Sequence, residues 1–216
     1  MKILGLYLPA YHKDKINDMS WGENFTEWDN VKDGKPLYKN HYQPIVPLNN
    51  NYYDLSKKEV IENQIKLAKE YKIDGFIFYH YWFGNDVTAL TKPAEILKDE
   101  VKSQIDYCFC WANHSWLKNW INGNNEVIAK QTYGDNFEWK KHIDYLIPFF
   151  KDKRYLKIDN KPMLYIYNMS DIPNFNDMLK LWNESLKKEG FDGLYIIEFI
   201  SSKNRNKNYE KTDAVV

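Results

Sequence analysis

Short apolar runs alternate along this chain with segments of mixed polarity. The run 73–83, "IDGFIFYHYWF", is apolar after an Asp-Gly turn, which is typical of a strand buried on both faces. The segment 56–71 instead places its apolar residues on one side of a helix, and Ser56 and Glu59 fit a capping box at its start. The expected strands are 2–11, 73–83, 106–113, 163–168 and 192–200, with another starting at 213. The expected helices are 56–71, 93–100, 136–150 and 174–189, the last closed by Gly190.

A strand followed by a helix, repeated along the chain, predicts parallel strands joined by right-handed crossovers. The two candidate architectures are a (β/α) barrel and a doubly wound sheet. A nucleotide-binding doubly wound sheet would carry a Gly-rich loop after its first strand, and none follows residues 2–11. The sequence therefore favours an α/β fold of the (β/α)8 TIM-barrel type, incomplete with about five to six strands, in one domain over residues 1–216.

The segment 12–55 shows neither a helical nor a strand period. A loop of this length inside a compact domain is usually functional or disordered. Its many Trp, Tyr and Phe residues argue against disorder, which is usually poor in aromatic residues. We therefore expect an ordered functional loop.

Composition narrows the possible functions. The 30 basic and 30 acidic residues cancel, so no global field attracts nucleic acid or anionic lipid. No apolar run approaches the roughly 20 residues of a membrane span, and no signal peptide is recognisable, so a cytoplasmic protein is expected. Cys108 and Cys110 lie two apart in a strand, where a disulfide would be strained, and are expected as buried thiols. Aromatic residues reach 17% of the chain, and such rings can bind the flat faces of sugars.

The ends of the predicted strands carry the chemically interesting side chains. In a barrel the chemistry lies at the carboxyl ends of the strands, whereas the amino ends serve stability. Polar and aromatic residues follow several strands, as in "CFCWANHSW" (108–116) and at His80 to Trp82. Asp74 and Asp192 precede their strands and are expected to be structural. The topology therefore predicts that the strand-end residues meet at one mouth.

Eight blocks of this sequence resemble a known family. They are "LGLYLPAYH", "WGENFTEWDNV", "KPLYKNHYQPIVP", "YYDL", "IDGFIFYHYWF", "CFCWANHSW", "IAKQTY" and "DNKPMLYIYN". Their order and content resemble the WbsX-type polysaccharide-biosynthesis proteins, whose domain is similar to glycoside hydrolase family 99. The resemblance covers nearly the whole chain. It implies a (β/α)8 barrel acting on glycans, often in O-antigen or capsule gene clusters.

The chain departs from the family pattern in two places. His114 stands where the family usually has a glutamate, and glycosidases generally need two carboxyl groups across the scissile bond. The family also carries a late block resembling "EWNEW", which this chain does not reach. We therefore expect either a fragment of a longer protein or a diverged relative without hydrolase activity.

Three residues are candidates for catalysis. The resemblance implies that Glu27 lies in a long loop over the mouth; the alternative is a solvated loop acid. Glu198 would be a general acid of raised pKa if its strand face points inward, and otherwise a charge in the wall. His80 would contact sugar hydroxyls or move protons, or else be a hydrogen-bonded core histidine. The expected substrate-binding residues are His12, Trp28, His41, Tyr42, Tyr81, Trp82, Trp111, Asn113, His114, Trp116, Gln131 and Tyr167.

Three functions remain open. The preferred one is a carbohydrate-active protein of surface polysaccharide biosynthesis, acting by carboxylate acid/base chemistry on a glycan or lipid-linked oligosaccharide. The second is an inactive glycan-binding protein of the same fold. The third is a metal-dependent glycosyltransferase, which the lack of any Asp-x-Asp pair weakens. The scattered histidines predict no metal site, and no cofactor or nucleic-acid partner is expected.

Overall fold

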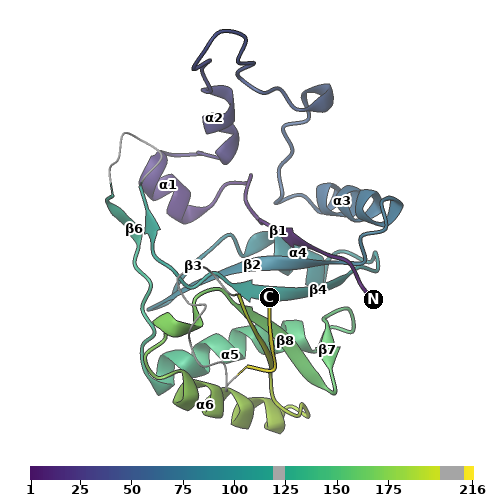
Figure 1. Cartoon of the computed structure of the whole chain (residues 1–216), viewed down its shortest axis with the longest axis vertical. Helices are drawn as coiled ribbons and strands as arrows, with labels where there is room; N and C mark the ends of the chain where they lie inside the picture. The colour runs from purple at the N-terminus through teal and green to yellow at the C-terminus, as the bar shows by residue number, and fades with distance from the viewer. Residues whose placement is uncertain (119–124, 200–211) are drawn as a thin grey trace.

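The computed structural model describes residues 1–118, 125–199 and 212–216. Its main sheet contains six parallel strands in chain order, without the reversal of a doubly wound sheet (Figure 1). They are β1 (Leu4–Tyr7), β2 (Gly75–Gly84), β4 (Asp106–Trp111), β8 (Lys161–Ile166), β9 (Tyr195–Glu198) and β10 (Ala214–Val215). This order confirms a sheet of the (β/α) barrel type, open and incomplete.

The helices between the strands agree with the predicted segments. They are α3 (Lys58–Glu70), α4 (Lys92–Asp99), α5 (Asn136–Phe150) and α6 (Phe175–Lys188). Gly190 follows α6 with a φ of 87°, so its closing role is confirmed. The capping box at Ser56 was wrong: Lys57 is the N-cap of α3, and the carboxylate of Asp54 accepts the Ser56 N–H at 2.8 Å instead.

The two faces of the sheet have different neighbours. We call the face under α5 and α6 the outer face, because Trp111 contacts His142 of α5 and Trp182 of α6 from it. Residues paired across parallel strands share a face, and neighbours along a strand alternate. His80 pairs with Trp111 and therefore also lies on the outer face. Tyr81 lies on the opposite, inner face.

Short hairpins add two strands to the sheet that the sequence did not predict. Strand β3 (Val87–Ala89) returns antiparallel to β2, and β7 (Lys157–Ile158) does so beside β8. Each connection is a pair of residues with positive φ, Asn85-Asp86 and Asp159-Asn160, as type I′ turns require. A separate hairpin joins β5 (Trp116–Leu117) to β6 (Val127–Ala129).

The segment 12–55 is ordered, as expected, but it is not all loop. It contains α1 (Lys15–Trp21), α2 (Glu27–Lys32) and the 3₁₀ turn η1 (Leu48–Asn50). Both helices are too short for a helical period to show in the sequence. Asp14 caps α1, and a capping box of Thr26 and Asp29 starts α2. Among the described residues, no helix is long and apolar enough to cross a membrane.

Candidate functional site

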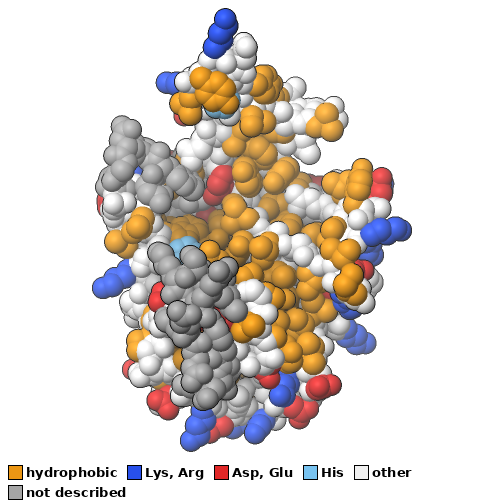
Figure 2. Space-filling view, in the orientation of Figure 1, with side chains coloured by type: hydrophobic (Ala, Val, Ile, Leu, Met, Phe, Trp, Pro, Cys, Tyr) orange, Lys and Arg blue, Asp and Glu red, His pale blue; other side chains and the backbone are white. Residues whose placement is uncertain are grey.

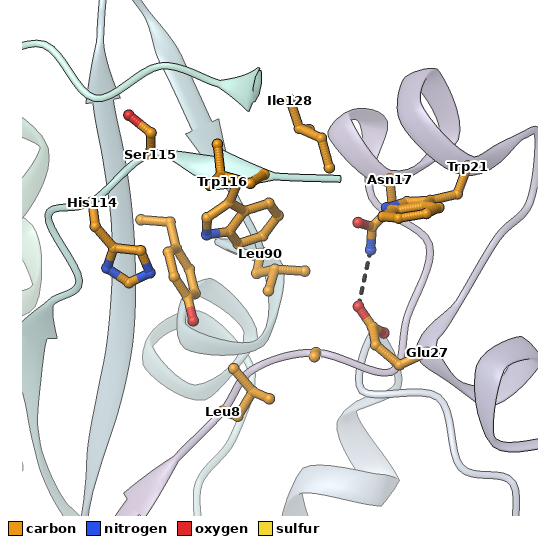
Figure 3. Close-up of a pocket in the computed structure, with 12 residues that line it drawn as sticks. Leu8, Asn17, Trp21, Glu27, Leu90, His114, Ser115, Trp116 and Ile128 are labelled. Atoms are coloured by element: carbon orange, nitrogen blue, oxygen red, sulfur yellow. Dashed lines mark hydrogen bonds between the residues drawn. The ribbon is translucent and has the colours of Figure 1, made fainter. Parts of the chain in front are cut away.

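A pocket of about 380 Å³ opens where β1, β2 and β4 end (Figure 3). Helix α1, the start of α2 and the β5–β6 hairpin complete its walls. Its lining is mostly apolar with a few polar groups, which is the usual composition of a ligand site. The lining residues are Leu8, Ala10, Asn17, Trp21, Glu27, Tyr81, Leu90, His114, Ser115, Trp116, Leu117 and Ile128.

Two protein donors hold the carboxylate of Glu27 at this pocket. Its Oε2 accepts the backbone N–H of Tyr11 at 2.5 Å, and its Oε1 accepts the side-chain amide of Asn17 at 3.0 Å. Tyr11 has a φ of 64°, which is unusual for a bulky residue and turns its N–H towards Glu27. A carboxylate offers about four acceptor positions, so room for further donors remains.

Asp14 joins the two elements beside Glu27. Its side chain accepts the N–H of Ile16 at 2.9 Å and so caps α1. Its second oxygen accepts the N–H of Leu90 at 2.8 Å, just after β3. Asn17 of α1 and Leu90 both line the pocket. One aspartate therefore fixes two walls of the pocket relative to each other.

Aromatic rings form much of the pocket wall. Trp116 packs edge-on against Tyr81 and Phe83, with ring centres 4.8 and 5.6 Å apart. His114 and Glu27 lie at opposite ends of the pocket in Figure 3. His114 also approaches the ring of Tyr167 at 5.6 Å, and partial desolvation lowers its pKa below 6.5. The pocket thus brings together four predicted residues: Glu27, Tyr81, His114 and Trp116.

The outer face holds four of the other predicted residues, and three of them lie close together. Nε2 of His80 lies 2.9 Å from Nε2 of His142, and the ring of Trp82 stacks on His142 at 4.7 Å. Trp111 is buried and donates its indole N–H to the carbonyl of Trp82 at 3.0 Å. The sequence suggested that His80, Trp82 and Trp111 contact sugar at the mouth. Side chains alternate between the two faces along β2 and β4, and these three point towards the helices instead.

Glu198 also lies away from the pocket. It pairs with Ile166, which pairs with Trp111, so the three share the outer face. Its side chain is buried. Glu198 would reach the mouth only from the inner face, and it therefore does not reach it.

Asn113 and Gln131 lie outside the pocket lining and form hydrogen bonds with neighbouring segments. Asn113 is buried and uses its amide on the backbone of Asn168 and on the hydroxyl of Tyr133. Gln131 donates its side-chain N–H to the carbonyls of Trp82 and Thr132 at 3.1 and 3.0 Å. The bonds of Asn113 occupy the amide that the sequence suggested for sugar hydroxyls, whereas the buried Oε1 of Gln131 has no hydrogen-bond partner among the described residues.

The remaining predicted residues lie outside the pocket lining. His12 is buried, and Trp28 donates its indole N–H to the carbonyl of Tyr53 at 2.7 Å. His41 accepts the Leu37 N–H at 3.1 Å in the segment after α2, where Tyr42 is exposed. Tyr167 is partly exposed beside His114. No group of three or more potential metal ligands gathers in the described ranges.

Sequence reasoning missed Asn17 and Trp21 of the pocket and the backbone N–H of Tyr11. Trp21 begins the block "WGENFTEWDNV", and that block could have pointed to it. Asn17 carried no signal, because α1 was not predicted. A backbone donor such as that of Tyr11 depends on its φ angle, which the residue type does not reveal.

The chain is similar to one curated protein and to two solved structures described here. The protein WxcX of Xanthomonas campestris pv. campestris is 29% identical over 196 residues in strains B100 and ATCC 33913. The match covers 90% of this chain, which spans only 28% of the length of WxcX. Two structures of the GH99 endo-α-mannosidase from Bacteroides thetaiotaomicron also match. Their TM-scores are 0.48 and 0.47 and their identities 12% and 15%. The matches cover 94% of this chain and 54% and 56% of those chains.

The family model of glycosyltransferase WbsX matches residues 3–216, almost the whole chain. The sequence blocks that resembled this family therefore belong to a match along almost the whole chain. This chain belongs to the glycosyltransferase WbsX family.

Proposed function

We propose that the pocket binds a sugar unit of a surface-polysaccharide glycan and that Glu27 acts on it as an acid/base carboxylate. Family membership supports a carbohydrate-related role in polysaccharide biosynthesis. The observation that carries the proposal is the oriented Glu27 carboxylate in a pocket walled by Trp21, Tyr81 and Trp116.

The pocket suits a sugar better than most ligands of its size. Its volume of about 380 Å³ is in the range of small-molecule sites. Indole and phenol rings match the flat C–H faces of a pyranose. The remaining acceptor positions of Glu27 match hydroxyl donors, and His114 offers a polar contact at the other end.

Glu27 is fixed in the way an acid/base group requires. Tyr11 and Asn17 orient its two oxygens. One carboxylate oxygen can therefore take the proton of a bound hydroxyl while the hydroxyl oxygen bonds to the anomeric carbon of a glycosyl donor and the donor's leaving group departs with the electron pair of the broken bond. It is the one carboxylate among the described residues that line the pocket. A hydrolase with two carboxyl groups would need a second one from another segment.

Binding without turnover is the second candidate function. His114 lies at the pocket end opposite Glu27, where the family pattern has a glutamate. An imidazole can hydrogen-bond to a glycan and move a proton, but it does not replace a carboxylate nucleophile.

Titration with a panel of oligosaccharides separates these functions. Trp21 and Trp116 line the pocket, so their fluorescence reports binding, and mass spectrometry of the same mixtures reports turnover. We expect Glu27→Gln to bind within about tenfold of the wild type and to lose about 10²–10⁴-fold in turnover. Glu70→Gln, at an exposed position in α3, is the matched control.

Each outcome has a definite meaning. Saturable binding with no turnover by the wild type would establish the binding function in place of the catalytic one. A fluorescence signal that stays flat across the panel would refute both.

A further inference from the structure

The segment that follows the exposed Asp33 at the end of α2 and runs to the end of η1 presents an unusual set of side chains. We call residues 34–50 the arm; Figure 1 shows it at the top, away from the sheet. Six large apolar side chains within it are exposed: Leu37 (84%), Tyr38 (69%), Tyr42 (70%), Ile45 (56%), Val46 (43%) and Leu48 (84%). Single exposed apolar residues are normal in soluble proteins, but a contiguous group marks an interaction surface.

The arm holds its shape through its own contacts. The ring of His41 stacks on Tyr38 with centres 4.6 Å apart and an interplanar angle of 8°. Nδ1 of His41 accepts the N–H of Leu37 at 3.1 Å, and His41 N–H donates to the carbonyl of Tyr38 at 3.1 Å. These bonds keep Leu37 and Tyr38 on a folded tip, so their exposure is a feature of the structure.

The base of the arm is anchored to the rest of the domain. The Lys32 ammonium lies 4.8 Å from the centre of the Tyr52 ring, and Tyr52 packs edge-on against Trp28 of α2. Trp28 is in turn bonded to the carbonyl of Tyr53. The residues that directly follow the arm therefore pack on α2, whose first residue is Glu27.

Charge on the arm has one sign. Residues 34–53 contain no Asp or Glu, whereas Lys35 and Lys39 are exposed beside the apolar tip. Neither lysine forms an ion pair with a carboxylate in the described parts of the chain. The net charge of zero for the whole chain hides this local excess. Figure 2 shows lysine atoms next to apolar side chains at this end of the molecule.

We propose that the arm docks the protein on an anionic lipid bilayer. Leucine, isoleucine and valine side chains enter the boundary between headgroups and acyl chains, tyrosines lie at the headgroup level, and lysines pair with anionic lipid. A protein partner is a weaker match, because lysines around an apolar patch without any carboxylate complement a surface of uniform negative charge. The proposal is independent of the glycan site, although it would bring that site to a membrane surface.

Vesicle flotation tests the arm directly. The chain is mixed with phosphatidylcholine vesicles, either pure or with about one-third phosphatidylglycerol, and floated through a density gradient. We expect flotation with the anionic vesicles and its loss at about 1 M salt, where the Debye length falls to about 3 Å. The variants Leu37→Ser/Leu48→Ser and Lys35→Gln/Lys39→Gln should each lower the partition coefficient about tenfold or more.

Matched controls exist on α3 and at its C-cap, Tyr71. Leu67 and Tyr71 are similarly exposed apolar residues, and Lys66 and Lys69 are exposed lysines. Leu67→Ser/Tyr71→Ser and Lys66→Gln/Lys69→Gln should float like the wild type. The proposal fails if the wild type stays at the bottom of the gradient or if the α3 pairs lose as much binding as the arm pairs. It also fails if the arm variants change only the sedimentation coefficient of the free protein, which would assign the arm to contact with a second copy.

Discussion

The side-chain amide of Asn113 hydrogen-bonds to both backbone polar groups of Asn168. Its Oδ1 accepts the Asn168 N–H at 2.8 Å, and its Nδ2 donates to the Asn168 carbonyl at 2.7 Å. Asn113 follows β4 and Asn168 follows β8, which are neighbours in the sheet. The amide therefore links the segments that follow β4 and β8, next to His114 of the pocket.

Replacing Asn113 by alanine should destabilise the fold by about 2–4 kcal/mol. The change removes a buried amide and leaves the N–H and carbonyl of Asn168 without these partners. Urea unfolding followed by circular dichroism measures the loss. Asn125→Ala, at an exposed position, should change stability by less than about 0.5 kcal/mol. Equal unfolding midpoints for the two variants would show that the Asn113 bonds contribute nothing.

Asp14→Ala should destabilise the protein by about 1–2 kcal/mol. It removes the cap of α1 and the bond to the N–H of Leu90. Asp14→Asn keeps a capping oxygen and should recover much of the loss. Thermal unfolding compares the three proteins. If asparagine is no better than alanine, the cap is not the source of the stability.

Trp116→Ala should weaken glycan binding roughly three- to tenfold, if the proposed function holds. The substitution removes one aromatic wall of the pocket, and aromatic packing contributes about 0.5–1.5 kcal/mol beyond area burial. Trp116→Phe should retain most of the affinity, because a ring still packs on Tyr81 and Phe83. The measurement is calorimetric titration, with near-UV circular dichroism to confirm that each variant is folded. Unchanged affinity in the alanine variant would place the glycan elsewhere.

The main elements of this fold could be predicted from the sequence, whereas the faces of its strands could not. Strand β2 is apolar on both sides, so periodicity identified a buried strand but did not say which side His80 would take. Only the pairing of His80 with Trp111, and the helices packed on that face, reveal it. The sequence likewise did not say which face of β9 Glu198 would occupy.

The short elements show a different limit. Asn85-Asp86 and Asp159-Asn160 favour tight hairpin turns, yet the strands β3 and β7 that they create have only three and two residues. Such strands are too short for alternation to be recognised. Glu27 was found by its resemblance block, but its fixed orientation depends on the unpredicted helix α1 and on Tyr11 in a left-handed conformation.

The buried pair of His80 and His142 should make the protein sensitive to mild acid. Burial lowers the pKa of His80 from 6.5 to about 3, and burial together with the neighbouring His80 lowers that of His142 well below 6.5. Both imidazoles therefore stay neutral in the folded chain, one donating to the other, while the unfolded chain binds protons below about pH 6.5.

Because the unfolded state binds more protons, the free energy of unfolding should fall as pH falls from 6.5 towards 3 and should be independent of these groups above 6.5. Each histidine contributes up to about 1.4 kcal/mol per pH unit, so the two together should cost roughly 3 kcal/mol between pH 6.5 and pH 5. Urea unfolding at a series of pH values measures this slope.

Carboxylates also titrate in acid and contribute to the slope of the free energy of unfolding against pH. Comparing this slope between variants isolates the contribution of the histidines. His142→Gln keeps a hydrogen-bonding side chain but removes one titrating group, so it should reduce the slope by about half even if it lowers stability at pH 7. A slope that is the same in wild type and His142→Gln would mean that the buried pair does not govern acid stability.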